Sequence, residues 1–510
     1  MSSDPRAPLP AGGSASSPST AHTGTDMAQR SGQSDSLIIG VLALTGIVVS
    51  LAQTLVVPIL GQLPLIFSTS AANTSWIVTV TLLAGAVSTP VLGRLGDMYG
   101  KKRILLVAIT PFILGSALCA VSTSLLPMIL GRALQGLANG MVPLGISLLH
   151  DVLPPGRVGS AIALMSSSMG IGGALGLPIA AAVTQFANWR VLFWATAVAA
   201  AIAAVALWRA LPAGRRPRTS GRFDAVGAVG LAIGLVALLL GVSKGAEWGW
   251  RSALTIGCLA VAVVVLLAWG RYELGRSQPL VDLRTTGRPV VLLTNLASIL
   301  VGFAMYAMNL ILPQVMQLPV DLGYGLGQGM FQMGLWIAPM GLGMFIVSTP
   351  GARLSRCRGP RTTLMLANLV IAAGYGLAAL ILATVGNRAP GDAGGPVVLT
   401  LILLSAAAGI AGCGTGLAFG AMPALIMGGV PAQQKAAANG FNALMRSLGT
   451  TSSAAVIGIL LASMTQPIGG HAVPTQGGFV TALLVGGVAA LVAAGFSFAI
   501  PGRANTRPEH

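Results

Sequence analysis

The stretch GRLGDMYGKKR, residues 93–103, lies between two long apolar runs and carries five charged side chains in eleven positions. Only 8% of the whole chain is charged, so this concentration needs an explanation. A loop between two membrane helices needs Gly for a tight backbone turn, and Lys or Arg to hold it on the inner side. This reading accounts for Lys101, Lys102 and Arg103. It does not account for Asp97, an acid placed among bases where a helix ends.

The composition around this stretch is that of an integral membrane protein. Hydrophobic residues fill 54% of the 510 positions and the mean hydropathy is +0.82, which is too apolar for a soluble domain. Apolar runs of about 20 residues, each able to cross about 30 Å of hydrocarbon as a helix, recur from residue 37 to residue 501. Few aromatic residues and no strict alternation argue against a β-barrel. We therefore expect an all-α membrane fold.

The apolar runs predict fourteen membrane spans. They are expected at 37–60, 75–95, 103–122, 125–149, 158–184, 190–211, 224–243, 252–272, 288–312, 328–351, 361–385, 396–428, 434–463 and 477–500. The first 36 residues are rich in Ser, Ala, Gly, Thr and Pro and predict a disordered tail.

An internal repeat organises these spans. TLVVPILGQLP (54–64) recurs as NLILPQVMQLP (309–319), and Ser-Thr-Pro at 88–90 recurs at 348–350. The charged stretch is repeated too: Arg94, Leu95 and Gly100 correspond to Arg353, Leu354 and Gly359. Eight helices intervene between matching spans, so both copies cross the bilayer in the same direction, as in the parallel repeats of transporters.

The repeat divides the chain into two halves with an insertion between them. The predicted parts are a cytoplasmic tail (1–36), a six-helix bundle (37–211), a basic linker with two inserted helices (212–287), a second six-helix bundle (288–501) and a cytoplasmic C-terminal tail (502–510).

The positive charge follows from membrane topology. The net charge of +17 could suggest nucleic acid, but the bases lie singly or in short clusters between apolar runs. With residues 1–36 inside, the outer loops hold only four of the 29 Lys and Arg: Arg190, Lys244, Arg251 and Arg388. This positive-inside bias predicts that both termini lie in the cytoplasm. It also explains the net positive charge without nucleic-acid binding.

Nothing in the sequence predicts a cofactor, a metal or an enzyme. The four Cys and four His are scattered without metal-ligand spacing. No GxxxxGK[ST] phosphate loop occurs, so ATP is not expected to drive transport. A membrane-bound enzyme would need His, acid or Cys residues converging at one depth, and the spans contain no such set.

The charged stretch resembles the cytoplasmic signature between the second and third helices of the major facilitator superfamily. The residues in register are Gly93, Arg94, Leu95, Asp97, Gly100, Lys101, Lys102 and Arg103. The resemblance implies that the acid and bases form ion pairs and helix-end contacts. These contacts would latch the two halves together on the inner side and would break and remake during alternating access.

Two further motifs narrow the resemblance to fourteen-helix drug:proton antiporters. RALQGLANG (132–140) is similar to the fourth-helix motif of proton-coupled members. GIGGALGLP (170–178) is similar to their glycine-rich fifth-helix motif, except that Leu177 separates the last glycine from proline. The motif positions are Gly170, Gly172, Gly173, Gly176 and Pro178. They would serve close helix packing or, alternatively, a hinge.

Polar residues inside the spans are candidates for a cavity or proton site. A cation at the bilayer centre costs about 2.5–3.5 kcal/mol, so Arg132 should face the protein interior or a water-filled cavity. It would bond backbone carbonyls there, or tune a proton site or face the cargo; Gln135 and Asn139 share its helix face. In the second half, Asn309 is either a packing contact or a ligand contact, and Arg446 is a candidate to line the cavity. Two such arginines would favour anionic groups.

A buried acid is missing from the spans. Many drug antiporters of the resembling family carry an acid in the first helix, where this chain has Gln53, and an amide does not titrate in the physiological range. A cationic drug would lack a counter-charge, so we expect neutral or anionic cargo. Proton coupling would use a peripheral acid such as Asp97 or Asp224, or the cargo's own ionisable group.

The sequence thus predicts a monomeric exporter of the bacterial inner membrane. It would move amphipathic small molecules such as drugs, antibiotics or secondary metabolites by alternating access with proton antiport. The alternative is an importer or facilitator of a small metabolite, against which the glycine-rich fifth span argues.

Overall fold

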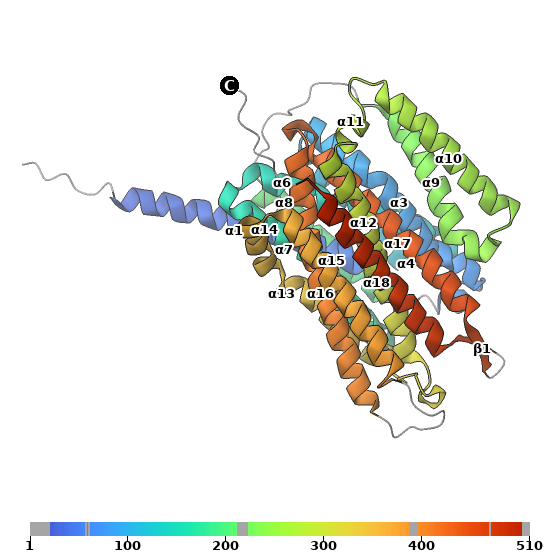
Figure 1. The fold of residues 1–510 in the computed structure, drawn as a ribbon. Coiled ribbons are helices and arrows are strands. Elements are labelled where there is room, and N and C mark those ends of the chain that lie inside the picture. The colour runs from blue at the N-terminus through green and yellow to red at the C-terminus, as the bar shows by residue number, and fades with distance from the viewer. Residues whose placement is uncertain are drawn as a thin grey trace, which may run out of the picture.

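The computed structural model describes residues 21–56, 59, 62–211, 223–386, 396–468 and 471–501. These residues form a long bundle of helices, with a two-stranded hairpin at one end (Figure 1). Helices suit this apolar chain because each backbone N–H and C=O finds its partner inside the helix, where hydrocarbon offers none.

The first half contains six spans built from eight elements. Their bounds are α1 (Ala21–Thr54), α3 (Ala71–Tyr99), α4 (Lys101–Val121), α5 (Leu125–Gly136), η1 (Leu137–Gly140), α6 (Met141–Val152), α7 (Pro155–Phe186) and α8 (Arg190–Ala210). A short helix, α2 (Leu63–Ile66), precedes α3. The insertion supplies α9 (Ala225–Trp248), α10 (Ala253–Leu274) and the short α11 (Leu283–Thr286).

The second half repeats this plan. Its elements are α12 (Pro289–Gln317), η2 (Val320–Leu322), α13 (Met330–Ile346), α14 (Ser348–Arg358), α15 (Pro360–Ala383), α16 (Val397–Gly429), η3 (Ala432–Gln434), α17 (Lys435–Ser463) and α18 (Gln476–Ala499). Strands β1 (Thr465–Ile468) and β2 (His471–Pro474) pair antiparallel before α18, with Thr465 opposite Pro474.

Thirteen described helices are long and apolar enough to span a membrane. The remaining predicted span, 125–149, is divided into α5, η1 and α6 by a turn of 3-10 helix. Its backbone stays right-handed through the change, since φ is −58° at Gly136 and −71° at Gly140. The helical path therefore continues without a gap through the predicted fourth span.

Some predicted boundaries differ from those of the structure. Residues 21–36, predicted as part of a disordered tail, belong to α1, because a helix nucleated in the apolar residues 37–54 adds one backbone hydrogen bond for each further residue. The tenth span, Met330–Arg358, is long and apolar enough to cross a membrane, and the single residue Val347 divides it into α13 and α14. Residues 1–20, residues 502–510 and most of the basic linker lie outside the described residues.

The two halves are confirmed as copies of one plan. Within the first half α7 packs against α1, and α4 against α5 and α8; within the second, α17 packs against α12, and α15 against α16 and α18. The same turn recurs as well. Gly100 joins α3 to α4 with φ +97°, and Gly359 joins α14 to α15 with φ +85°. Both values lie in the region that favours glycine.

The halves meet along two seams. In what we name the latch seam, α3 packs against α17; in the second seam, α7 packs against α13 and α14. The inserted hairpin, α9 and α10, lies beside the bundle, and α9 packs on both helices of the latch seam (Figure 1). Leu231, Leu235 and Leu239 of α9 share a buried cluster with Leu83 of α3 and Phe441 of α17.

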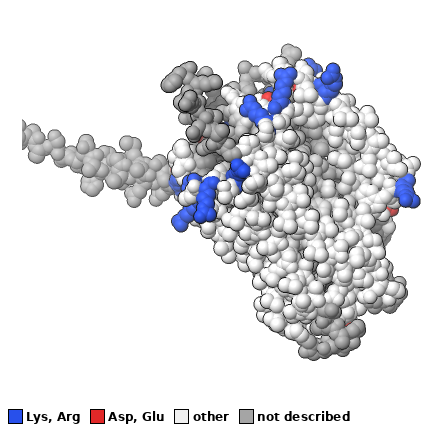
Figure 2. All heavy atoms as spheres, viewed as in Figure 1, with Lys and Arg blue, Asp and Glu red and all other residues white. Residues whose placement is uncertain are grey.

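Basic residues gather at one end of the molecule. Figure 2 shows most of the visible Lys and Arg near the end where α6, α11 and α14 lie, and few at the end that carries β1. We name the basic end, which also holds Gly100 and the first turn of α17, the latch end. The other is the far end.

Candidate functional site

The charged stretch 93–103 is not a loop but two helices joined by one residue. α3 continues to Tyr99, Gly100 makes the turn, and α4 begins at Lys101. The predicted span 75–95 therefore ended too early, because charged residues were taken to end a helix that in fact runs on. The consequence is that Asp97 and Lys101 are held on rigid elements.

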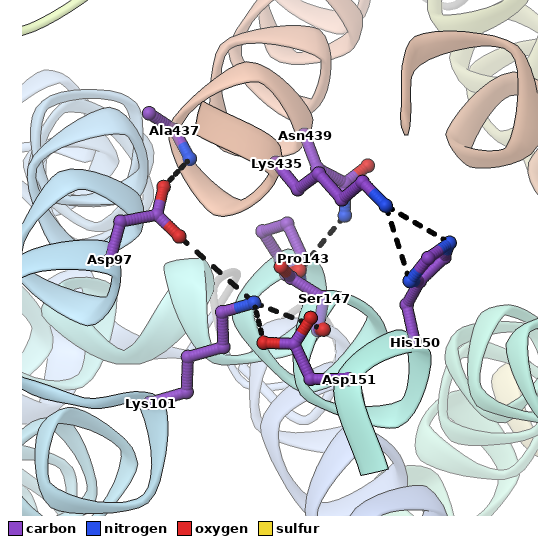
Figure 3. Close-up of polar contacts among 9 residues, drawn as sticks. All are labelled: Asp97, Lys101, Pro143, Ser147, His150, Asp151, Lys435, Ala437 and Asn439. Carbon is purple, nitrogen blue, oxygen red and sulfur yellow. Dashed lines mark hydrogen bonds and ion pairs between the residues drawn. The ribbon is translucent and has the colours of Figure 1, made fainter. Parts of the chain in front are cut away.

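Asp97 joins the two halves. It lies in the last turn of α3, is only 7% exposed, and its Oδ2 accepts a hydrogen bond of 3.0 Å from the backbone N–H of Ala437 (Figure 3). Ala437 belongs to the first turn of α17, whose N–H groups lack partners within their own helix. A carboxylate also complements the positive end of the helix dipole. An acid of the first half thus caps a helix of the second.

Lys101 ties this acid to the rest of the first half. Its Nζ lies 4.0 Å from Asp97 Oδ1 and 2.6 Å from Oδ2 of Asp151, and it donates to the carbonyl of Ser147 (Figure 3). The side chain of Lys101 is 7% exposed, so its charge needs these partners. Asp97, Lys101 and Asp151 form a chain of charges from α3 to α6.

Two further contacts close the same end. Asn439 of α17 donates to the carbonyl of Pro143 on α6 at 2.8 Å. The Nζ of Lys435 lies 3.4 Å and 3.5 Å from the two ring nitrogens of His150 (Figure 3). We use the name latch for two sets of contacts. The first set joins Asp97, Lys101 and Asp151 to one another and to α17. The second set consists of the contacts of Asn439 with Pro143 and of Lys435 with His150.

Glycine lets the helices of the latch seam approach closely. A Cβ on Gly93 would lie 2.6 Å from the carbonyl oxygen of Ala436 on α17. A Cβ on Gly440 would lie 2.8 Å from the carbonyl oxygen of Thr89 on α3. Both neighbours are backbone atoms that cannot move alone, so the seam requires glycine at these positions.

The remaining members of the motif lie around the latch. Arg94 is 6% exposed and lines a cavity of about 150 Å³ with the segment 277–286 and the start of α17. Lys102 donates to the carbonyl of Leu211, at the end of α8. Arg103 is exposed. Only part of the predicted motif therefore takes part in contacts between the halves.

Arg132 and Gln135 lie inside the first half. Arg132 is 2% exposed and donates to the carbonyl of Ala52 at 2.9 Å and to Oε1 of Gln135 at 2.7 Å. Gln135 in turn donates to the hydroxyl of Ser116 at 2.8 Å. The set connects α1, α4 and α5, as expected of a buried cation that bonds backbone carbonyls.

Two of the predicted polar candidates, Gln53 and Asn139, are in contact. Gln53 Nε2 donates to Asn139 Oδ1 at 3.2 Å, and both side chains are half-buried. Asn309 of the second half donates to the carbonyl of Met305 in its own helix and is not joined to them. These three amides can accept or donate hydrogen bonds, but none of them titrates.

Arg446 lies between the halves. Its guanidinium stacks over the ring of Phe419, 4.5 Å from the centroid. Together with Ser166 and Asn439 it lines a cavity of about 10 Å³ with walls from both halves, a volume near the minimum for one water molecule. Ser166 also bridges the halves here by donating to the carbonyl of Phe419. Arg132 and Arg446 thus do not line one cavity in this conformation.

The glycine-rich motif brings α7 close to both neighbours. A Cβ on Gly172 would lie 2.7 Å from the carbonyl of Ile47 on α1, and Gly176 packs on Thr54 of the same helix. Gly170 faces Met344 of α13 in the second half. Pro178 in turn packs against Gly334, while Gly173 has open space around it. The motif contributes to the second seam as well as to the first half.

Sequence reasoning missed the partners on the second half. The latch uses a backbone N–H of Ala437 and the side chains of Lys435 and Asn439, on a helix 340 residues away from Asp97. A backbone donor has no sequence signature, so only the acid could be found. Among the described residues no group of three or more His, Cys, Asp or Glu could hold a metal ion.

Comparisons with known proteins agree with this architecture. The sequence profile of the Major Facilitator Superfamily matches residues 42–454. An uncharacterised MFS-type transporter of Mycobacterium tuberculosis is 31% identical over 319 residues, covering 61% of this chain and 44% of that protein. The match therefore spans less than half the length of that relative.

Two relatives with names that state an activity match over more of their length. The tetracenomycin C resistance and export protein of Streptomyces glaucescens is 27% identical over 403 residues, covering 77% of this chain and 70% of that protein. Multidrug resistance protein 3 of Bacillus subtilis is 24% identical over 426 residues, covering 83% and 78%.

Solved structures share the fold. The proton:xylose symporter XylE superposes with a TM-score of 0.65 at 14% identity, covering 92% of this chain and 96% of the other. The human organic anion transporter MFSD10 gives 0.59 at 16% identity, covering 91% and 99%. At these identities the likeness concerns the arrangement of helices alone.

Proposed function

Because the chain belongs to the major facilitator superfamily, we propose that it exports amphipathic small molecules across a bacterial inner membrane in exchange for protons. The latch end faces the cytoplasm, and the two halves rock about the cavity region near Arg446. The latch is the inner gate, closed here and broken when the cargo is loaded from the cytoplasm.

The observation that carries this proposal is the contact of Asp97 with the first turn of α17. It is the kind of contact that an alternating-access protein needs, because it crosses between the halves and depends on one charge and one backbone N–H. Breaking it exposes the unpaired N–H groups of α17 to water, which can solvate them at the cytoplasmic surface. The latch can therefore open without an unsatisfied buried group.

The proposed cargo is neutral or anionic. The cation Arg446 lies between the halves, stacked on Phe419, and lines a cavity with walls from both halves. No acid lies near the middle of a predicted span to balance a cationic cargo. The names of the two relatives, a tetracenomycin C resistance and export protein and a multidrug resistance protein, support a drug or a secondary metabolite as cargo.

Transport in vesicles of defined orientation tests the proposal. Everted vesicles with an acidic lumen should accumulate an anionic or neutral fluorescent amphiphile, and right-side-out vesicles should not. Equal movement in both directions without dependence on the pH gradient would show a facilitator instead. Accumulation of a cationic dye at the same rate would overturn the assignment of the cargo. Asp97→Asn serves as the variant with an impaired gate.

A further inference from the structure

Two carboxyl groups of the inserted hairpin face the same buried space at the latch end. Asp224 caps the start of α9, and Glu273 lies in the last turn of α10. A Cβ on Gly227 would lie 2.7 Å from Asp224 Oδ2 and 3.0 Å from Glu273 Oε2. Asp224 Oδ2 and Glu273 Oε2 therefore border the same small space, which is open because Gly227 has no side chain.

Each carboxyl has one satisfied oxygen and one unsatisfied oxygen. Asp224 Oδ1 accepts from the N–H of Gly227 at 2.8 Å and from the hydroxyl of Tyr272 at 3.0 Å. Glu273 Oε1 accepts from the N–H of Val281 at 2.7 Å. Asp224 Oδ2 and Glu273 Oε2 are both buried and have no hydrogen-bond partner, and Glu273 is only 2% exposed.

Two ionised carboxylates in this position would repel each other and leave two buried acceptors without donors. One proton on either group removes the repulsion between two ionised carboxylates, and a protonated carboxyl can donate a hydrogen bond to an oxygen of its neighbour. The other charged or titratable groups around the pair are Arg94 on α3, Tyr272 and Arg276 on α10, and Asp282 and Arg284 at α11.

We propose that Asp224 and Glu273 share one proton taken from the cytoplasm, and that this proton controls the grip of the hairpin on the latch through Arg94. Arg94 lines one cavity with Val281, whose N–H binds Glu273 Oε1, and it lies three residues before Asp97 on α3. When the pair is fully ionised, two negative charges hold Arg94 and the latch end of α3. When the proton binds, this attraction weakens and the latch opens more easily.

The inference rests on the proposed function, which places the latch end on the cytoplasmic side. It adds a proton site, which the predicted spans lack. The hairpin is well placed for the role, since α9 packs on both α3 and α17. At the far end, Lys244 holds the hairpin to α3 by stacking over Trp76 at 4.8 Å and donating to Ser75. The far end of the hairpin is therefore fixed to α3, and a change in the charge of the Asp224–Glu273 pair acts on the end near the latch.

Infrared difference spectra between acidic and neutral pH, recorded on the whole protein in lipid nanodiscs, test the shared proton. The wild type should show C=O stretches of protonated carboxyls, and Asp224→Asn and Glu273→Gln should each remove the same one of these bands. Asp97→Asn is the matched control and should keep it. If neither hairpin variant removes a signal that the wild type shows, or if the wild type shows none, the shared proton is refuted.

Spin labels at positions 99 and 433, in a variant whose four cysteines are replaced, report the latch. This measurement uses a His150→Gln background, because His150 contacts Lys435 in the same latch. The latched fraction should fall severalfold as the pH is lowered, and Glu273→Gln should lower it at neutral pH and flatten its pH response, leaving only the response of Asp97 in the latch itself. An unchanged pH response in Glu273→Gln would refute the coupling to the latch. Neither readout involves cargo, so a failure of export leaves this test intact.

Discussion

The two copies of the charged turn have the same backbone but opposite charge at one position. Gly100 and Gly359 both end a helix with positive φ, yet the position of Asp97 in the first copy is Arg356 in the second. Asp97 is buried and caps α17. Arg356 is exposed beside the start of α7, where a Cβ on Gly159 would lie 3.8 Å from its Nη1. A cation does not cap a helix N-terminus, so only one copy can act as a latch.

The difference extends to the packing of the two seams. The latch seam is closed by glycine contacts, whereas the second seam borders a cavity of about 990 Å³ whose lining includes Arg356, Arg358 and Arg361 but no acid. The duplicated fold thus has a closed side and an open side at the same end. The repeated fold produces two similar seams, and single residue differences between the two copies determine which seam is closed.

The largest expected effect comes from adding one methyl group to the latch seam. Gly93→Ala places a Cβ 2.6 Å from a backbone oxygen of α17, and overpacking of this kind costs about 1–3 kcal/mol. The latched fraction measured with spin labels at 99 and 433 should fall about ten- to hundredfold. The control is the equivalent position of the second copy, Ala352→Val, which borders the large cavity and should leave the latched fraction near wild type. Equal effects would show that the seams do not differ.

Removing the charge of Asp97 should have the next largest effect. Asp97→Asn keeps the shape of the side chain but gives up the charge-assisted bond to Ala437, a loss of about 1–2 kcal/mol. The latched fraction should fall about tenfold, and transport in everted vesicles should fall with it. Arg356→Gln removes a charge at the equivalent position and should change neither by more than about twofold. A larger effect for Arg356→Gln would contradict the assignment of the gate to the first copy.

Local patterns in the sequence predicted the scaffold well. Apolar runs gave the spans, and the repeated Gly and Arg positions gave the two halves, because hydropathy and turn residues act over short distances. The extension of α3 through Asp97 is missed for the same reason. Charge was taken to end a helix, although here it is neutralised by partners from distant segments.

The sites were predicted less completely, because their partners are set by packing between distant helices. Asp97 was identified as a gate residue, but its partner is a main-chain N–H. Arg132 could have faced a cavity or backbone carbonyls, and only the arrangement of α1 beside α5 decides for the carbonyl of Ala52. Glu273 looked like a residue at a helix end, and its approach to Asp224 depends on how the hairpin folds.

A smaller effect should follow when the second copy is given the acid of the first. Arg356→Asp would place a carboxylate beside the N-terminal turns of α7, an arrangement worth about 0.3–1 kcal/mol at an exposed site. Spin labels at positions 156 and 357 should then report a second seam that is closed up to about fivefold more often. Arg356→Asn tests whether loss of the cation alone is sufficient. An unchanged distance in Arg356→Asp would show that charge does not distinguish the two seams.

The smallest expected effect is a pH dependence confined to the latch side. Asp282 is partly buried, which raises its pKa, but hydrogen bonds from Thr285, from the N–H of Arg284 and from Gln434 outweigh burial and hold the pKa below its usual value. Gln434 directly precedes α17, so these bonds tie the insertion to the latch seam, whereas α7 is preceded by Pro154, which has no side-chain donor.

A lowered pKa in the folded protein stabilises the fold above the ordinary value for Asp, about 3.9, and this contribution is lost as the pH falls further. The thermal midpoint of the wild type, followed by Trp fluorescence in detergent, should therefore fall more steeply between about pH 5 and about pH 3 than that of Asp282→Asn. Asp321→Asn removes an exposed acid at the far end and serves as the control. If Asp282→Asn and Asp321→Asn flatten the dependence of the thermal midpoint on pH equally, the loss of any acidic residue explains the effect. The hydrogen bond between Asp282 and Gln434 would then not distinguish the latch seam from the second seam.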